Sequence, residues 1–262
     1  MTSVLLLALA PTFFVMLLGY SAGRLRIVNN MHVAELNIVV MSYALPAALF
    51  LAVASTEWSA LVAQWALLLS LAVMMMVTYA AWYLYQRLGR KQDPGEAALQ
   101  SLAVGQPNFA AAGFPVIAAL VGPGHLSTVA LAIAAGSLFP SPVTLVLLER
   151  DQRRTRTAVA VVHALSKPIE FHLTRNTLLR VGVANVVQPL LTFALCVGIG
   201  ADVEITKLSV VMAALPSGFF GVLFGTSYGR PSSEANSTII ASTIFSAFTL
   251  AAAIAWTYSY RG

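Results

Sequence analysis

Residues 97–121 read AALQSLAVGQPNFAAAGFPVIAALV. The segment is apolar and exceeds the roughly 20 residues that a helix needs to cross a bilayer, yet it contains Gly105, Pro107, Gly113 and Pro115. Proline removes a backbone donor and interrupts an α-helix. Lipid cannot satisfy the released backbone groups, so such a break persists only where protein or a water-filled cavity covers it. The segment therefore predicts a discontinuous membrane helix beside a functional cavity.

A second segment has the same character. Residues 207–227 read KLSVVMAALPSGFFGVLFGTS, with Pro216 and Gly218 near the middle. In each half of the chain an uninterrupted apolar segment precedes the broken one, and a segment rich in small residues follows it. The two triplets are expected to enter the membrane from opposite sides, which predicts an inverted repeat of the kind found in secondary transporters.

The composition sets the fold class. Of the 262 residues 58% are hydrophobic and 10% are charged, whereas a soluble domain carries about 25% charged residues. No stretch alternates with the period of two that a membrane β-barrel requires, so helices must satisfy the backbone in lipid. We therefore expect an all-α integral membrane protein of about eight transmembrane helices, at residues 4–23, 32–54, 59–85, 97–121, 126–148, 177–200, 207–227 and 236–258.

The basic residues predict the orientation of these helices. All Lys and Arg residues except Lys207 and Arg261 fall in alternate connections, on one side of the membrane. Positively charged connections stay in the cytoplasm, so both termini are expected outside, in the inner (plasma) membrane of the cell. Arginines follow the apolar run 4–20 rather than precede it, so we expect a retained helix and not a signal peptide. The basic residues of these cytoplasmic connections also account for the net charge of +5. The positive charge therefore does not indicate a nucleic-acid partner, and none is expected.

The proposed division of the chain follows from these helices. Residues 1–148 would form a first repeat of five helices, and residues 149–176 a basic cytoplasmic loop that begins ERDQRRTR. Residues 177–262 would form a partial second repeat of three helices.

Asn108 is the first candidate for substrate binding. It follows the first break, and a neutral amide can donate to a carboxylate without burying a fixed charge. A helix cap is the alternative role, because Asn is a favoured capping residue. Two opposed breaks aim the positive ends of helix dipoles at one place and favour an anion there. The remaining candidates are Gly105 and Pro107 in the first break, Pro216, Ser217 and Gly218 in the second, and Asn37 and Tyr43 on the second helix.

Other polar residues have simpler explanations. The hydroxyl series of the last helix could line a polar path, but such residues more often allow close helix packing. It comprises Ser237, Thr238, Ser242, Thr243, Ser246 and Thr249. With a single cysteine, Cys196, and no H-E-x-x-H motif or paired acids at mid-span, we expect no metal site, cofactor or catalytic residue. The protein is not expected to be an enzyme.

Several short motifs occur in an order that resembles a known family. They are Glu35-Leu36-Asn37 with Ala44-Leu45-Pro46, Gly105-Gln106-Pro107-Asn108 with Gly113-Phe114-Pro115, Ser166-Lys167-Pro168, and Met212-Ala213-Ala214-Leu215-Pro216-Ser217 with Tyr228-Gly229. Together they resemble the auxin efflux carrier family, whose bacterial members include proteins described as malonate transporters. The resemblance extends over nearly the whole chain, and it implies an anion-contacting asparagine at Asn108.

The family resemblance implies ten helices in two inverted five-helix repeats. Helices one, two, six and seven of that fold form a scaffold, and the others form the transport part. This sequence differs, because it passes from Lys167-Pro168 within a few residues to Arg175, so most of helices six and seven have no counterpart. The absence of two helices, an even number, leaves each later helix crossing the membrane in the same direction as its counterpart in the family.

Two functions remain open on the sequence. The first is a secondary transporter of small organic anions, mono- or dicarboxylates such as malonate or malate. The second is a truncated membrane subunit or remnant that binds but does not transport. The expected partners are a small carboxylate and the lipid bilayer, and a second copy of the chain in a homodimer is a further candidate.

Overall fold

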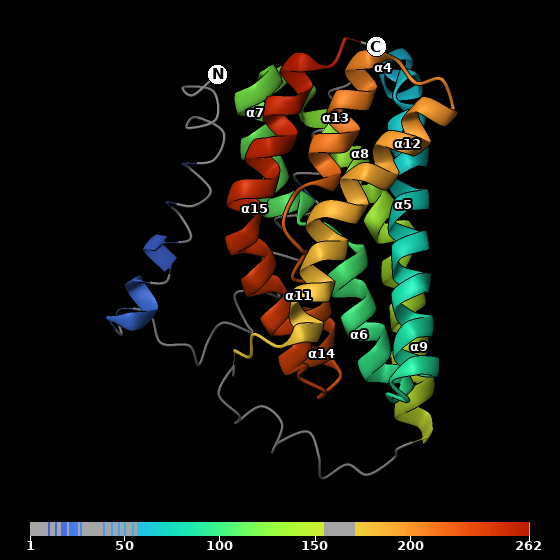
Figure 1. The fold of residues 1–262 in the computed structure, drawn as a ribbon, viewed down its shortest axis with the longest axis vertical. Coiled ribbons are helices and arrows are strands. Elements are labelled where there is room, and N and C mark those ends of the chain that lie inside the picture. Colours follow the sequence, from blue (N-terminus) through green and yellow to red (C-terminus); the bar gives the residue numbers. More distant parts are fainter. Residues whose placement is uncertain are drawn as a thin grey trace. The chain divides into compact units, whose positions relative to one another are not determined.

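The computed structural model describes residues 57–154 and 171–261, together with scattered positions between 10 and 54. It divides into two compact units, residues 1–65 with 110–131 and residues 66–109 with 132–262. Every element in the described ranges is helical, as Figure 1 shows. The all-α prediction is confirmed for this part of the chain.

The first unit contains short helices among its described residues. These are α4 (Trp58–Ala63), α7 (Phe114–Val121), the 3₁₀ turn η5 (Pro123–His125) and the beginning of α8 (Leu126–Leu138). Pro115 lies in the first turn of α7, which continues directly from the π-turn η4 (Phe109–Gly113).

The second unit contains most of the described structure. Its elements are α5 (Trp65–Leu84) with the π-turn η3 (Tyr85–Gly89), α6 (Pro94–Gly105), α9 (Pro140–Arg154), α11 (Arg175–Gly182), the π-turn η6 (Val183–Val187), α12 (Gln188–Gly198), α13 (Val203–Ala213), α14 (Phe220–Ser227) and α15 (Ser233–Ser259). A further π-turn, η4 (Phe109–Gly113), begins at its edge.

Among the residues that the structure describes, four helices are long and apolar enough to cross a membrane: Trp65–Gly89, Leu126–Gln152, Arg175–Gly198 and Ser233–Ser259. They coincide with the uninterrupted helices predicted at 59–85, 126–148, 177–200 and 236–258. The second of them continues through the charged residues that were predicted to begin a loop, and α9 ends only at Arg154. Arg, Glu and Gln are good helix formers, so the helix continues where the apolar pattern stops.

The two broken helices are also confirmed. The predicted helix 97–121 is divided into α6 and the helical segment Phe109–Val121, and the predicted helix 207–227 into α13 and α14. The first break lies at Gln106–Asn108 only: Gly113 and Pro115 do not interrupt the helix as predicted, because the π-turn η4 continues directly into α7. Asp93 caps the start of α6, since its side chain accepts from the Glu96 N–H at 3.0 Å. The predicted helices 4–23 and 32–54 lie largely outside the described residues, so the total of about eight helices stays a prediction.

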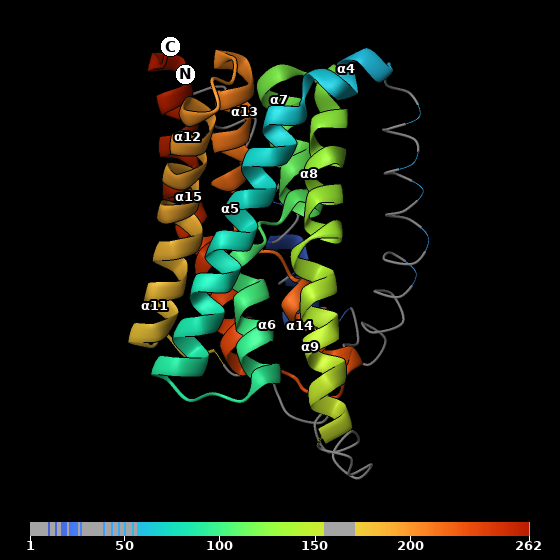
Figure 2. The ribbon, with the colours of Figure 1, turned by 90° about the vertical axis from the view of Figure 1, so that its right-hand side faces the viewer.

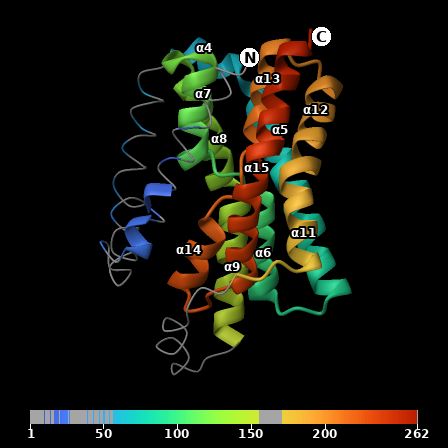
Figure 3. The same ribbon diagram turned by 60° about the vertical axis from the view of Figure 1, so that its left-hand side comes forward.

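Helix α6 forms the centre of the second unit. Residues 97–105 are all buried, and α6 packs against α9, α14 and α15. Figures 2 and 3 show α6 enclosed by these helices and by α5. Small residues permit this packing: a Cβ atom at Gly221 of α14 would lie 2.8 Å from the Leu99 carbonyl oxygen. The central helix ends at Gly105, where the candidate site begins.

Candidate functional site

The two breaks in the second unit meet and pair through their backbones. Pro107 and Ser217 form an isolated antiparallel bridge. The Asn108 N–H donates to the Pro216 carbonyl at 2.7 Å, and the Gly218 N–H donates to the Gln106 carbonyl at 2.7 Å. We name residues 106–108 and 216–218 together the crossover.

The pairing explains how both breaks are tolerated in an apolar environment. In an uninterrupted α-helix the Asn108 N–H would bond to Val104 four residues earlier, but Pro107 ends that pattern. The Pro216 carbonyl accepts this N–H instead. Each break thus satisfies backbone groups that the other break releases, as a buried backbone requires.

Side chains from neighbouring helices complete the crossover. The Ser217 N–H donates to the Ser242 hydroxyl of α15 at 2.9 Å. The Ser141 hydroxyl of α9 donates to Gln106 Oε1 at 3.2 Å. Gly136 leaves room for the Gln106 amide, because a Cβ atom there would collide with it. Contacts with α8 and α9 therefore position the first break, and a hydrogen bond to α15 positions the second.

Ser217 carries a hydroxyl that the described structure leaves without a partner. The residue is 1% exposed, and its Oγ has no hydrogen-bond partner among the described residues. An unpaired buried hydroxyl costs about 1–3 kcal/mol. Such a group beside two discontinuous helices can donate to or accept from a ligand, which makes Ser217 a candidate contact.

Six of the eight predicted site residues come together in the second unit. Gly105 ends α6, and Pro107, Asn108, Pro216, Ser217 and Gly218 belong to the crossover. Asn108 is half-buried. Asn37 lies outside the described residues, and Tyr43 belongs to the first unit, where it is 71% exposed. The roles of both in binding stay predictions.

Three further residues support the crossover but were not selected as site residues from the sequence: Ser242, Asn185 and Gln188. Ser242 stood in the hydroxyl series assigned to helix packing. That interpretation holds for Thr238, Thr243 and Ser246, whose hydroxyls donate to carbonyls of their own helix. Asn185 and Gln188 are buried amides within the apolar span Arg175–Gly198, and that uncommon placement was the available signal.

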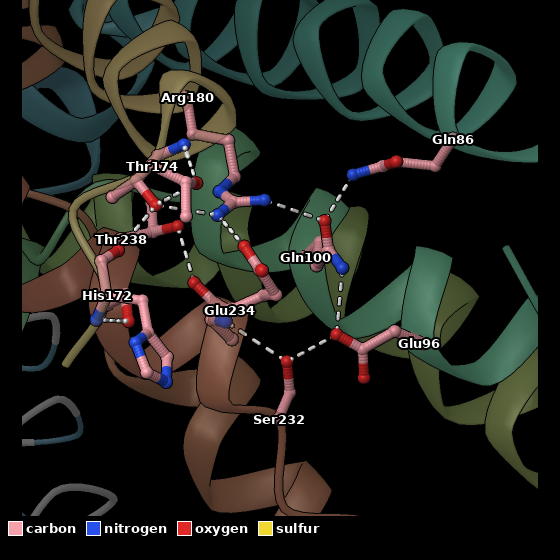
Figure 4. Close-up of polar contacts among 12 residues, drawn as sticks. Gln86, Glu96, Gln100, His172, Thr174, Arg180, Ser232, Glu234 and Thr238 are labelled. Carbon is pink, nitrogen blue, oxygen red and sulfur yellow. Dashed lines mark hydrogen bonds and ion pairs between the residues drawn. The ribbon is translucent and has the colours of Figure 1, made fainter. Parts of the chain in front are cut away.

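A second polar cluster lies at the end of the unit where α6 and α15 begin. Arg180 of α11 is 1% exposed and forms an ion pair with Glu234 in the first turn of α15. Arg180 Nη1 also donates to Gln100 Oε1 of α6 at 2.9 Å. Figure 4 shows the guanidinium lying between these two side chains. Arg180 was counted among loop residues from the sequence. That placement was wrong, because Glu234 and Gln100 provide partners for a charge inside the helix.

Further hydrogen bonds join this cluster to the start of α6. Gln100 Nε2 donates to Glu96 Oε1 at 2.8 Å, and the Ser232 hydroxyl donates to the same oxygen at 2.6 Å. Gln86 of η3 donates to Gln100 (Figure 4). Beside them Arg230 pairs with Asp93 at 2.6 Å and with Asp151. The cluster ties α5, α6, α9, α11 and the start of α15 together at one end.

One sequence pattern associated with hydrolases occurs near this end. Gly225-Thr226-Ser227-Tyr228-Gly229 has the spacing G-x-S-x-G, which in hydrolases places a serine on a strand-to-helix turn. Here Ser227 is the last residue of α14, and its hydroxyl donates to the Leu223 carbonyl at 2.9 Å. The motif lacks the structural context of a nucleophile.

The comparisons with known proteins agree with a transporter. The chain is 28% identical over 168 residues to the "Uncharacterized transporter YfdV" of Escherichia coli (strain K12), and equally to proteins of that name in Escherichia coli O157:H7 and Shigella flexneri. The match covers 62% of this chain and 53% of each relative, so the chain spans about half the length of these relatives. The family model described as "Membrane transport protein" matches residues 4–172. The chain therefore belongs to this family of membrane transport proteins, the auxin efflux carrier family.

Proposed function

We propose that this protein is a secondary transporter of small organic anions, with mono- or dicarboxylates such as malonate or malate as its substrates. The observation that carries the proposal is the pairing of the two breaks, in which Asn108 bonds to Pro216 and Gly218 bonds to Gln106. Discontinuous helices that meet inside a membrane protein are characteristic of substrate sites in secondary transporters.

The groups at the crossover suit a carboxylate. Within the second unit, α14 begins at Phe220, two residues after Gly218 of the second break. The N-terminal end of a helix carries a partial positive charge and unpaired N–H groups that favour an anion. The Asn108 amide and the Ser217 hydroxyl would add neutral donors, which avoids burying a fixed positive charge.

We further propose that the two broken helices belong to inverted repeats. Each follows an uninterrupted span, Trp65–Gly89 or Arg175–Gly198, and precedes another, Leu126–Gln152 or Ser233–Ser259. The antiparallel bridge between Pro107 and Ser217 supports this arrangement, because inverted copies bring equivalent segments together in opposite directions.

The distribution of charge supports a cytoplasmic location for the end that holds Arg180. Arg230 pairs there with Asp93, beside the basic connection between η3 and α6, and with Asp151 near the basic end of α9. Positive charges concentrate on the cytoplasmic side of a membrane protein. We therefore propose an inner-membrane protein with both termini outside.

A second candidate function follows from the helices predicted from the sequence. Helices six and seven of the family pattern have no counterpart among them, because the chain passes within a few residues from Lys167-Pro168 to Arg175. Without that part of the scaffold the chain would bind an anion but not move it, unless a second copy or a partner chain supplies the missing surface.

The test is uptake of radiolabelled malonate and malate into proteoliposomes that contain the purified chain. Asn108→Ala is compared with Asn176→Ala, a change of the same residue type at a half-buried position on α11. Saturable uptake that Asn108→Ala abolishes and Asn176→Ala retains is the expected result. Binding of malonate without uptake would favour the second candidate. Neither binding nor uptake of either acid, by correctly inserted protein, would contradict the assigned substrates.

A further inference from the structure

The helix Arg175–Gly198 presents two buried amides toward the two breaks. Asn185 belongs to the π-turn η6, and Gln188 is the first residue of α12. Both side chains are almost fully buried. Neither amide bonds to its own helix in the contacts described here: Asn185 reaches α15, and Gln188 reaches α5 and α6.

Gln188 compensates for the first break. The Val104 carbonyl loses its usual helical partner, because the Asn108 N–H donates to Pro216. Gln188 Nε2 donates to this carbonyl at 2.8 Å and lies 3.1 Å from the Thr78 hydroxyl of α5. The last turn of α6 is therefore held in place from a neighbouring helix at the position where its own ladder ends.

Asn185 acts on the second break through Ser242. The Ser242 hydroxyl accepts the Ser217 N–H at 2.9 Å and donates to Asn185 Oδ1 at 2.6 Å. Asn185 Nδ2 in turn donates to the Ser242 carbonyl at 3.0 Å. The bond to the Ser242 carbonyl anchors the Asn185 amide on α15, and the bond from the Ser242 hydroxyl to Asn185 Oδ1 orients that hydroxyl toward the Ser217 N–H.

The π-turn explains why one helix can serve several partners. The Gln188 N–H donates to the Val183 carbonyl, five residues earlier. In a regular α-helix Arg180 and Asn185 would lie about 140° apart around the axis, from 3.6 residues per turn. The wider turn reduces this angle, so that Arg180 and Asn185 both meet α15, at Glu234 and Ser242. Such π-turns occur frequently at functional sites.

We propose that Asn185, Ser242 and Gln188 are positioning residues for the anion site at the crossover. This inference rests on the proposed function. They hold the Ser217 backbone and the end of α6, and so keep the Ser217 hydroxyl and the Asn108 amide in the geometry that receives the carboxylate. The Ser217 N–H already donates to the Ser242 hydroxyl. The Ser217 hydroxyl, and not its backbone N–H, is therefore the group that can hydrogen-bond to the substrate.

The test combines a local and a functional measurement on the full chain in lipid nanodiscs. Hydrogen–deuterium exchange is followed in peptides that cover residues 102–110 and 213–220, and malonate and malate affinities are measured on the same samples. The variants are Ser242→Ala, Asn185→Ala, their double variant, and Gln188→Met. The matched control is Ser246→Ala, the same change one turn later on α15 at a buried hydroxyl that donates within its own helix.

Ser242→Ala and Asn185→Ala are expected to raise exchange in 213–220 and to weaken anion affinity about tenfold, the effect of one lost buried hydrogen bond. The double variant is expected to be no weaker than Ser242→Ala, since both changes remove the same support. Gln188→Met is expected to raise exchange in 102–110. Ser246→Ala should change neither exchange nor affinity, even if it lowers the unfolding temperature.

The outcomes separate this inference from the proposed function. Equal exchange at 213–220 in Ser242→Ala and Ser246→Ala would overturn the positioning role. Raised exchange with unchanged anion affinity would overturn its link to binding. If exchange rises as expected but the unaltered protein binds neither acid, the residues still position the crossover, and the assigned substrates are wrong.

Discussion

The Gly218 N–H donates to the Gln106 carbonyl at 2.7 Å, and a Cβ atom at position 218 would lie 2.8 Å from that same oxygen. The two breaks can therefore approach this closely only because residue 218 is glycine. The neighbouring atoms are backbone, the carbonyl oxygens of Gln106 and Pro107, so they cannot move aside as a flexible side chain could.

Gly218→Ala is expected to separate the two halves of the crossover. Overpacking of this kind costs about 1–3 kcal/mol, and it should lower the unfolding temperature in detergent and weaken malonate binding. Gly182→Ala is the control, because a Cβ atom there meets nothing within 4 Å and alanine is a better helix former by about 1 kcal/mol. Equal stability of the two variants would contradict the close approach.

Ser217→Ala is expected to affect stability and binding differently. The hydroxyl is buried without a described partner, so its removal should leave the unfolding temperature unchanged or slightly raised. Malonate affinity should fall about tenfold if the hydroxyl contacts the carboxylate. Ser209→Ala provides the comparison, because Ser209 on α13 is equally buried and its Oγ also lacks a described partner. An equal loss of affinity in both variants would argue against a contact at Ser217.

Arg180→Met is expected to destabilise the second unit by leaving Glu234 and Gln100 without their partner. Removing one member of a buried pair costs about 3–5 kcal/mol, and the lower end applies because the Glu234 side chain is 36% exposed. Arg175→Met, at an exposed position of the same helix, should cost far less. Unfolding in detergent measures both.

The pair itself is tested by adding Glu234→Gln to each background. In Arg180→Met this second change should be nearly neutral or stabilising, whereas alone it should destabilise. Additive losses would show that Arg180 and Glu234 contribute independently of each other.

The orientation in the membrane can be tested with single cysteines in a Cys196→Ala background. Asp202→Cys and Gln152→Cys place thiols at exposed positions near opposite ends of the second unit's helices. In intact cells a membrane-impermeant maleimide should label position 202 and not position 152, because the proposed topology places the basic end in the cytoplasm. In inside-out vesicles the pattern should reverse. Labelling of position 152 from outside would contradict the assigned topology.

Much of the fold in the described residues could be predicted from the sequence. Apolar length predicted the four uninterrupted spans, since a membrane helix must satisfy its own backbone and must match the bilayer thickness. Proline and glycine predicted the breaks at Pro107 and Pro216 because these residues act locally on the chain. The end of α9 at Arg154 was missed, because the apolar pattern records the edge of the lipid and not the end of the helix.

The candidate site was predictable only in part. The residues of each break could be selected because the features that mark them lie within a few positions of one another. Their partners could not: Ser217 bonds to Ser242, and Val104 bonds to Gln188, across 25 and 84 positions of sequence. Nothing in the local sequence distinguishes Ser242 from Ser246, which differ in whether the hydroxyl bonds across helices or within one.

Composition and local sequence are enough to predict that this chain is helical, that it lies in a membrane and that two of its helices are interrupted, because these properties depend on hydrophobicity and on local backbone chemistry. The folded structure was needed to show that the two interruptions pair, that Arg180 is buried against Glu234, and that Asn185 and Gln188 support the crossover. These features depend on which helix faces lie together, and packing sets that through contacts far apart in the chain.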